Sequence, residues 1–208
     1  VLIRDGRIAW DDGRRKARRL ELAGVNLLVR NSGNVHRFAL RAVTARELAS
    51  AIDLRGELRG VSAATLEDWT GKLFAELEYT DLAAWREWID YPIEVKNGQG
   101  GVRLWFDVAG GRVTDLTADV ALAGVAARIT PTLPMLELDY LRGRLGASQK
   151  TTTPTSGVLG LLPGDNAARP AQFEQQVSGR GVALRTKGGV ALAPADFALR
   201  LRRPAPGG

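Results

Sequence analysis

The chain has 208 residues, of which 45% are hydrophobic and 25% charged, a composition typical of a globular protein rather than a disordered one. It contains no cysteine and a single histidine, which excludes a disulfide framework, a thiolate nucleophile and zinc sites built from cysteine or clustered histidine. The formal net charge of +6 would suit nucleic acid, but the aromatic residues lie mainly before residue 110 and the basic excess after residue 140, which excludes a basic groove with stacking aromatics.

The chain starts and stops in strand-like sequence. Its first residues, "VLIRDGRIAW", already alternate between apolar and polar, and "RLRRPAPGG" ends it directly after another such segment. No run approaches the roughly eighteen apolar residues of a membrane-spanning helix, and no leader precedes the first strand. We therefore expect an excerpt from a longer protein, with any signal or anchor lying upstream.

Alternation with a period of two is strictest in "AIDLRGELRG", residues 51–60, where apolar residues and glycines fall on one side and charged residues on the other. Because successive side chains of a strand point to opposite faces, this predicts a strand with one dry and one wet face. The earlier segments "GRIAW", "RLELAGVNLLVR" and "VHRFALRAV" show the same period between the turn sequences "DDG" and "NSGN". Gly24, in mid-strand, suggests a bulge or a close backbone approach.

The same pattern continues in "GKLFAELEY", "VRLWFDV" and "VTDLTADVALAGV", with "AGGR" as a tight hairpin turn between the last two. Further strands are expected at "MLELDYLRGRL", "VALRTK" and "DFALRLR". Together these segments make about ten strands in sequence order. The sequence therefore predicts an all-β, mostly antiparallel meander.

One segment, "TDLAAWREWIDYP", breaks the period of two. Its apolar residues Leu82, Trp85 and Ile89 recur at helical spacing, a threonine or aspartate before them provides an N-cap, and a proline follows. This predicts a single short helix near residues 81–90. We expect its two tryptophans to pack the helix onto the sheet rather than to form a binding platform.

The C-terminal third differs in composition. The stretch "GASQKTTTPTSGVLGLLPGDNAARPAQ" is rich in Gly, Thr and Pro and has no stable period. It predicts a loop or boundary at residues 149–172, between a β segment at 1–148 and further strands of the same sheet at 173–208. Residues 141–208 hold ten basic and three acidic side chains, which we expect on the solvated outer face of those strands.

Catalytic constellations are lacking. His36 lies beside Arg37 in a strand, where a neutral or solvent-facing histidine is expected, and no Ser or Thr near it has a nucleophile-elbow context. The glycine segments "GRG" and "NGQGG" lack the strand-then-helix setting of a phosphate loop. We therefore expect no enzyme activity, no cofactor and no metal site.

Several segments are recognisable together: "VLIRDGRIAWDD", "LAGVNLLVRNSGNVHRFALRA", "IDLRGELRG" and "LELDYLRGRLGA". The most specific is "YTDLAAWREWIDYP" followed by "GQGGVRLWFDVAGGRVTDLTADVAL". They resemble the YhdP family, the AsmA-like relatives of TamB in Gram-negative envelopes. The resemblance covers most of residues 1–148 and continues weakly through "GRGVALRTKGGVALAPADFALRLRRP".

This resemblance implies a middle section of a periplasmic protein that has an inner-membrane anchor on another part of its chain. It also implies a long β structure shaped as an apolar groove, through which phospholipids pass towards the outer membrane. The implied partner is phospholipid, with no nucleic acid, and membrane contact would be made by parts of the protein outside this chain.

The alternating pattern allows two interpretations of the apolar side. In the first, which we expect, the meander curves into an open hydrophobic groove and strand glycines curve the sheet or leave room on its inner wall. In the other, two sheets close on each other around an ordinary core, the glycines mark bulges, and the domain is structural or scaffolding and binds no lipid. The candidate lipid-groove residues are Phe38, Leu40, Ile52, Leu54, Leu58, Leu73, Leu77, Leu104, Phe106, Leu116, Val120 and Leu122.

Overall fold

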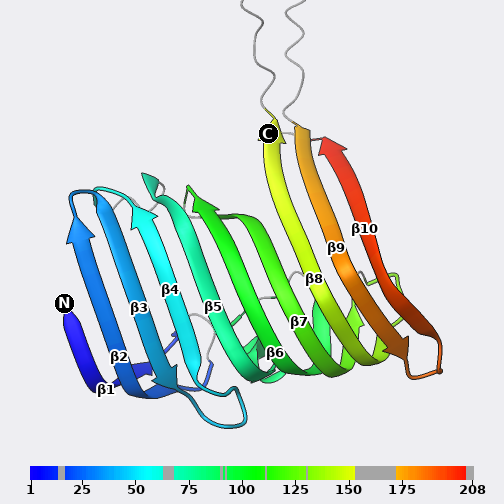
Figure 1. The fold of residues 1–208 in the computed structure, drawn as a ribbon, viewed down its shortest axis with the longest axis horizontal. Helices are drawn as coiled ribbons and strands as arrows, with labels where there is room; N and C mark the ends of the chain where they lie inside the picture. Colours follow the sequence, from blue (N-terminus) through cyan, green and yellow to red (C-terminus); the bar gives the residue numbers. More distant parts are fainter. Residues whose placement is uncertain are drawn as a thin grey trace, which may run out of the picture.

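The protein forms one antiparallel sheet of ten strands, and each strand pairs with its neighbours in sequence order (Figure 1). The edge strands β1 and β10 do not pair with each other, so the sheet is open and the predicted meander is confirmed. The computed structural model describes residues 1–13, 17–62, 68–89, 91, 93–110, 112–129, 131–152 and 172–204. The strands are β1 (Leu2–Trp10), β2 (Leu20–Ser32), β3 (Val35–Val43), β4 (Ile52–Arg59), β5 (Thr70–Asp81), β6 (Glu94–Ala109), β7 (Arg112–Arg128), β8 (Leu136–Thr152), β9 (Gln172–Thr186) and β10 (Ala191–Pro204).

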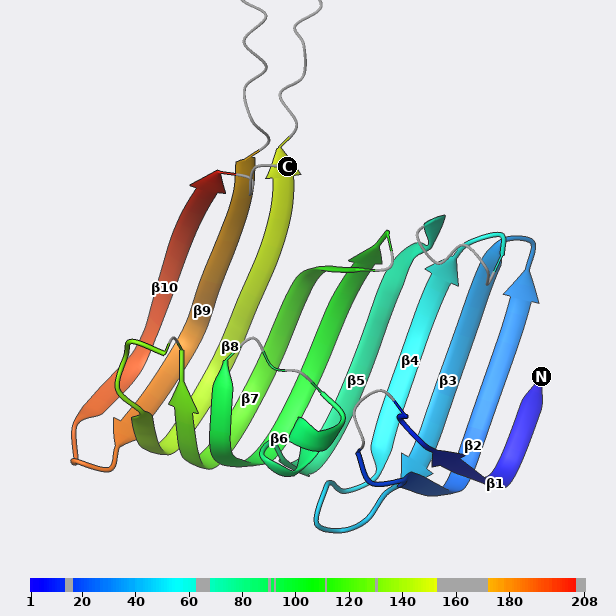
Figure 2. The ribbon, with the colours of Figure 1, turned by 180° about the vertical axis from the view of Figure 1, so that it is seen from behind.

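The sheet is strongly bent, so that two walls face each other. The long wall carries the main part of each strand, such as β2 from Val25 onward and β7 up to Leu122, and the short wall carries the strand ends beyond the bend, such as Leu22 and Val125 (Figure 2). The lower ends of several strands turn back in front of the rest of the sheet (Figure 2). Along this bend the side chains on the inner side are crowded and buried: Val25 is 0%, Ala42 2%, Val102 6% and Leu138 1% exposed. Outward neighbours such as Arg103 are exposed because the convex side of a bend spreads its side chains apart. The face that carries Val102 is therefore the concave face.

Strands that cross the bend step by three residues instead of two between successive concave-facing positions. At three of these steps a glycine has a left-handed backbone, with φ of 57° at Gly24, 58° at Gly124 and 57° at Gly181. Of the two alternatives predicted for Gly24, the bulge is confirmed, since the pairing register of β2 with β3 shifts between Ala23 and Asn26. The concave-facing pairs are Leu22 and Val25 on β2, Val95 and Gly98 on β6, Leu122 and Val125 on β7, Leu138 and Leu141 on β8, and Gly179 and Val182 on β9.

The predicted helix is present as a single 3₁₀ turn, η2 (Ala84–Glu87), which is shorter than residues 81–90. Asp81 prepares its start, because its carboxylate Oδ1 accepts the backbone N–H groups of Ala83 at 2.9 Å and Ala84 at 3.1 Å. So short a helix is not stable by itself, and its position depends on what it packs against.

Trp88, directly after η2, anchors this turn to the beginning of β2. Its side chain is buried against Leu20 and Leu48, and its indole N–H donates to the carbonyl oxygen of Arg18 at 2.9 Å. The expectation that tryptophan packs the helical turn onto the sheet is confirmed for Trp88. This contact joins segments seventy residues apart and closes part of the short wall.

The C-terminal strands continue the same sheet. Thr152 at the end of β8 pairs with Gln172 at the start of β9, and β10 pairs with β9 along most of its length. Strand β8 therefore reaches four residues into the segment predicted as a loop or boundary, and residues 153–171 lie outside the described part of the chain.

Candidate functional site

The concave face carries an unbroken row of apolar residues and glycine that crosses all ten strands. Its members are direct cross-strand partners from β1 to β10, and neighbouring strands lie about 4.8 Å apart, so the row is about 43 Å long. Each end is exposed, with Ile3 40% and Phe197 41% accessible to solvent. The row consists of Ile3, Leu27, Leu40, Leu54, Ala75, Leu104, Ala118, Leu145, Gly179 and Phe197.

Two further rows run parallel to this one, two residues away along the strands on either side. They bring the same kind of residue together from strands that are distant in sequence, so the face is a continuous apolar surface and not a set of separate patches. One row consists of Val29, Phe38, Gly56, Leu73, Phe106, Leu116, Ala147, Val177 and Leu199. The other consists of Ala42, Ile52, Leu77, Val102, Val120 and Gly143.

All twelve residues singled out from the sequence lie on this concave face. Leu122 is buried beside Val102 and Leu138 at the bend, while the other eleven are half-buried. Leu58 lies farthest from the bend, opposite His36 and Gly71. A core closed between two sheets would bury such residues fully, whereas here one open sheet leaves them in reach of solvent.

The sequence list missed about as many concave residues in β2 and in the C-terminal strands. The period of two is interrupted there by the three-residue steps. In "VSGRGVALR" of β9, the pair of glycines was the sequence feature that could have indicated such a step. The missed residues of the three rows include Leu27, Val29, Leu145, Val177, Phe197 and Leu199.

Charged residues on the convex face form ion pairs between neighbouring strands. Nε of Arg103 lies 2.7 Å from Oε1 of Glu76, and Nη2 of Arg144 lies 2.7 Å from Oδ2 of Asp119. The hydrogen bond from Arg144 lowers the pKa of the Asp119 carboxyl below its usual value. Comparable cross-strand pairs are Arg37 with Glu57, Lys72 with Asp107 and Arg41 with Asp53. The two faces of the sheet are therefore sharply different in polarity.

A pair of neighbouring aromatic residues, Phe74 and Trp105, also lies on the convex face, although the period of two predicts polar residues there. The rings of Phe74 and Trp105 are paired at a centroid distance of 5.4 Å. The guanidinium of Arg55 lies over Phe74 at 6.0 Å and that of Arg144 over Trp105 at 5.4 Å. These rings are covered by cations and so belong to the solvated surface.

Strand glycines on the concave face make room for aromatic rings from the next strand. A Cβ at Gly56 would lie 2.6 Å from Cε1 of Phe38, and one at Gly179 would overlap the ring of Phe197. Strand glycines therefore act in two ways within one open sheet: Gly24 and Gly124 have the left-handed bulge conformation, and Gly56 leaves space on the inner wall.

His36 has a structural environment near the rim of the concave face. Its ring stacks on Trp69 with centroids 4.9 Å apart, Nδ1 lies 3.0 Å from Oδ1 of Asn31, and Nε2 lies 3.1 Å from the carbonyl oxygen of Gly60. Within the described ranges, no group of three or more His, Cys, Asp or Glu residues could hold a metal ion. No helix in the described part is long and apolar enough to cross a bilayer.

Comparison with known proteins adds one finding to this geometry. No curated protein and no solved structure matches the chain. A family model described as "YhdP protein" matches residues 1–205, nearly the whole length, and agrees with the resemblance found in the sequence motifs. The chain belongs to the YhdP protein family.

Proposed function

We propose that this chain is a section of a bridge-like protein that carries phospholipid through the periplasm between the inner and outer membranes of a Gram-negative bacterium. One observation carries the proposal: the row through Leu54 and Leu104 presents apolar surface or glycine on every strand of an open sheet. Membership of the YhdP family supports it, because that family suggests an AsmA-like lipid transport role. In the longer protein an anchor would lie in the inner membrane.

Transport along such a surface needs no catalytic residue. An acyl chain lying on the concave face loses contact with water, which is favourable by about 25 cal/mol for each Å² of apolar surface buried. As the acyl chain of the lipid moves from Leu54 to Leu104, it exchanges one set of nonspecific contacts for an equivalent set. The ion-paired convex face stays in water, and the headgroups remain at the open side of the groove.

A scaffolding domain with a closed core is the alternative function. It predicts that the apolar side is sealed by a second sheet, whereas the ten strands form a single sheet, and eleven of the twelve candidate residues on its concave face are half-buried. No specific contact of the described residues favours that alternative.

Native mass spectrometry with lipid extraction, on protein purified from a Gram-negative periplasm, tests the proposal. Leu54→Asp places a charge in the middle of the apolar row and should remove co-purifying phospholipid. Ala39→Asp is the matched control, because Ala39 is on the convex face opposite Arg55 on the neighbouring strand, and it should leave lipid in place. Circular dichroism is used to check that both variants fold. Wild-type protein that is folded and binds no lipid, even when offered vesicles, would overturn the proposal.

A further inference from the structure

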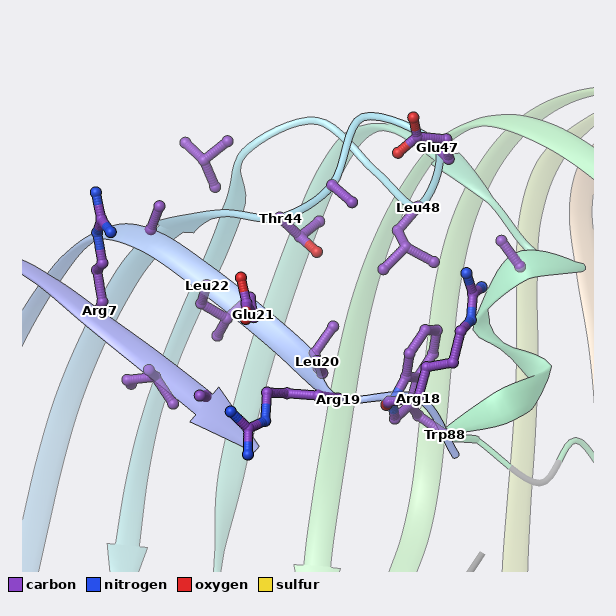
Figure 3. Close-up of a pocket in the computed structure, with 16 residues that line it drawn as sticks. Arg7, Arg18, Arg19, Leu20, Glu21, Leu22, Thr44, Glu47, Leu48 and Trp88 are labelled. Carbon is purple, nitrogen blue, oxygen red and sulfur yellow. The ribbon is translucent and has the colours of Figure 1, made fainter. Parts of the chain in front are cut away.

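The short wall has an opening between β2 and the segment after β3. Pairing between these strands ends at Ala23 with Val43, and the following chain turns away until Ala49 forms a bridge with Thr80 of β5. The separation leaves a pocket with a volume of about 670 Å³ between β2 and residues 43–48 (Figure 3).

The inner part of this pocket is apolar and continuous with the concave face. Leu20, Leu22, Leu48 and Trp88 line it. Leu22 lies one three-residue step from Val25, which begins the concave-facing positions of the long wall on β2. A hydrocarbon chain that enters through the opening would therefore reach the apolar rows without crossing a polar barrier.

One polar group in the lining has no partner among the described residues. Thr44 is 6% exposed, and its hydroxyl Oγ1 forms no hydrogen bond within the described part of the chain. Figure 3 shows this oxygen turned towards the space between Leu20 and Leu48. A buried hydroxyl without a partner is unfavourable, so a ligand oxygen that accepts its hydrogen bond would remove a cost that the empty pocket carries.

Both signs of charge surround the mouth of the pocket. Arg18 donates to the Glu87 carboxylate through Nε and Nη2, and Arg19 donates to Asp11 in the same way, so that no described residue accepts a hydrogen bond from the Nη1 of either arginine. Arg7 also lines the pocket. Two carboxylates of the lining, Glu21 and Glu47, form no ion pair with a described residue. Asp11 and Glu87 lie outside the lining but already neutralise two of these arginines, so with Glu21 and Glu47 the three arginines meet four carboxylates, which disfavours a ligand of net negative charge.

We propose that this opening is a side port of the groove that holds one zwitterionic, amine-bearing phospholipid. The phosphate accepts hydrogen bonds from one arginine of the mouth, the ammonium lies beside Glu21 or Glu47, and the Thr44 hydroxyl donates to an ester oxygen (Figure 3). The acyl chains pass over Leu20 and Leu22 onto the concave face. This inference rests on the proposed function, because it assumes that lipid occupies the groove.

Headgroup preference is the first test. The intact protein is mixed with vesicles of phosphatidylethanolamine and phosphatidylglycerol in equal parts, and bound lipid is identified by native mass spectrometry. The wild type should retain more phosphatidylethanolamine, and the double variant Glu21→Gln, Glu47→Gln should reduce that preference about fivefold. The matched control Asp107→Asn, Asp115→Asn removes two carboxylates from the convex face and should leave the preference unchanged.

Thr44→Val is the second test, because it keeps the shape of the side chain and replaces the hydroxyl by a methyl group. We expect a raised or unchanged midpoint of thermal unfolding and a severalfold loss of bound phosphatidylethanolamine. If lipid is bound but neither set of changes alters its headgroup or amount, the side port is wrong and the proposed function stands. If the wild type binds no lipid at all, the proposed function itself fails.

Discussion

Gly56 of β4 lies directly beneath the ring of Phe38 on β3. A Cβ built at position 56 would approach Cε1 of Phe38 and Cδ2 of Leu73 to 2.6 Å each, so the ring occupies the space of the missing side chain. A glycine under an aromatic ring keeps the wall level and apolar at a point where two large residues face each other across β4.

The first prediction compares two glycines of the same sheet. Gly56→Ala should lower the free energy of unfolding by less than about 1 kcal/mol, because the atoms it meets are the ends of side chains that rotate into the open groove. Gly100→Ala should lower it by about 3 kcal/mol, because its Cβ would overlap the backbone carbonyl of Ala121 and its φ is 148°. Urea denaturation measures both. Equal losses would mean that the Phe38 ring cannot move.

Alternation predicted the faces correctly wherever the pairing register stays regular. From Val35 to Leu122 the sequence period and the structural period agree in β3, β4, β5 and the long-wall part of β6 and β7, which is why the twelve candidate residues share one face. Burial on one side of a sheet constrains the sequence at every second residue, so this part of the fold is readable without the structure.

The position of the bend could not be predicted in the same way. On β7 the concave positions Leu122 and Val125 are three residues apart, and in "ADVALAGVAAR" nothing but Gly124 marks the change. The side port could not be predicted from the sequence either, because it depends on where β2 separates from β3 and on the contact of Trp88 with Arg18, seventy residues earlier. Such contacts are set by the curvature of the whole sheet and not by any local pattern.

A second prediction concerns the bend itself. Gly24 has φ of 57° and open space where a Cβ would be, so only the backbone conformation decides the cost of a substitution. Gly24→Asn should lose less than about 1 kcal/mol, because asparagine tolerates the left-handed region, whereas Gly24→Val should lose about 2 kcal/mol. Urea denaturation of the two variants checks the difference. A valine variant as stable as the asparagine variant would show that the bulge can relax.

A third prediction compares the two tryptophans around η2. Trp88→Phe removes the indole N–H that donates to the Arg18 carbonyl and should lower the free energy of unfolding by about 1–2 kcal/mol. The indole N–H of Trp85 is buried without a partner among the described residues, so Trp85→Phe should leave stability unchanged or raise it. Thermal unfolding of both variants makes the comparison, and a larger loss for Trp85→Phe would contradict it.

The fourth prediction is a pH dependence caused by Tyr91, whose hydroxyl donates to the carbonyl oxygen of Leu82 at 3.0 Å. Burial, with a smaller contribution from the nearby Asp81 carboxylate, raises the pKa of Tyr91 from 10.0 to about 12. Folding therefore favours the neutral phenol. This stabilisation is fully present below the ordinary pKa and is lost as the pH rises through the folded one.

We accordingly expect an ultraviolet titration of the folded protein to show a late tyrosinate step near pH 12 that Tyr91→Phe lacks. Since Tyr91 is partly exposed, its share of stability is about 1 kcal/mol, less than the full shift implies. The free energy of unfolding should decline more steeply with rising pH above pH 10 for the wild type than for Tyr91→Phe. Identical declines would show that the Tyr91 hydroxyl is solvated and does not donate to the Leu82 carbonyl oxygen.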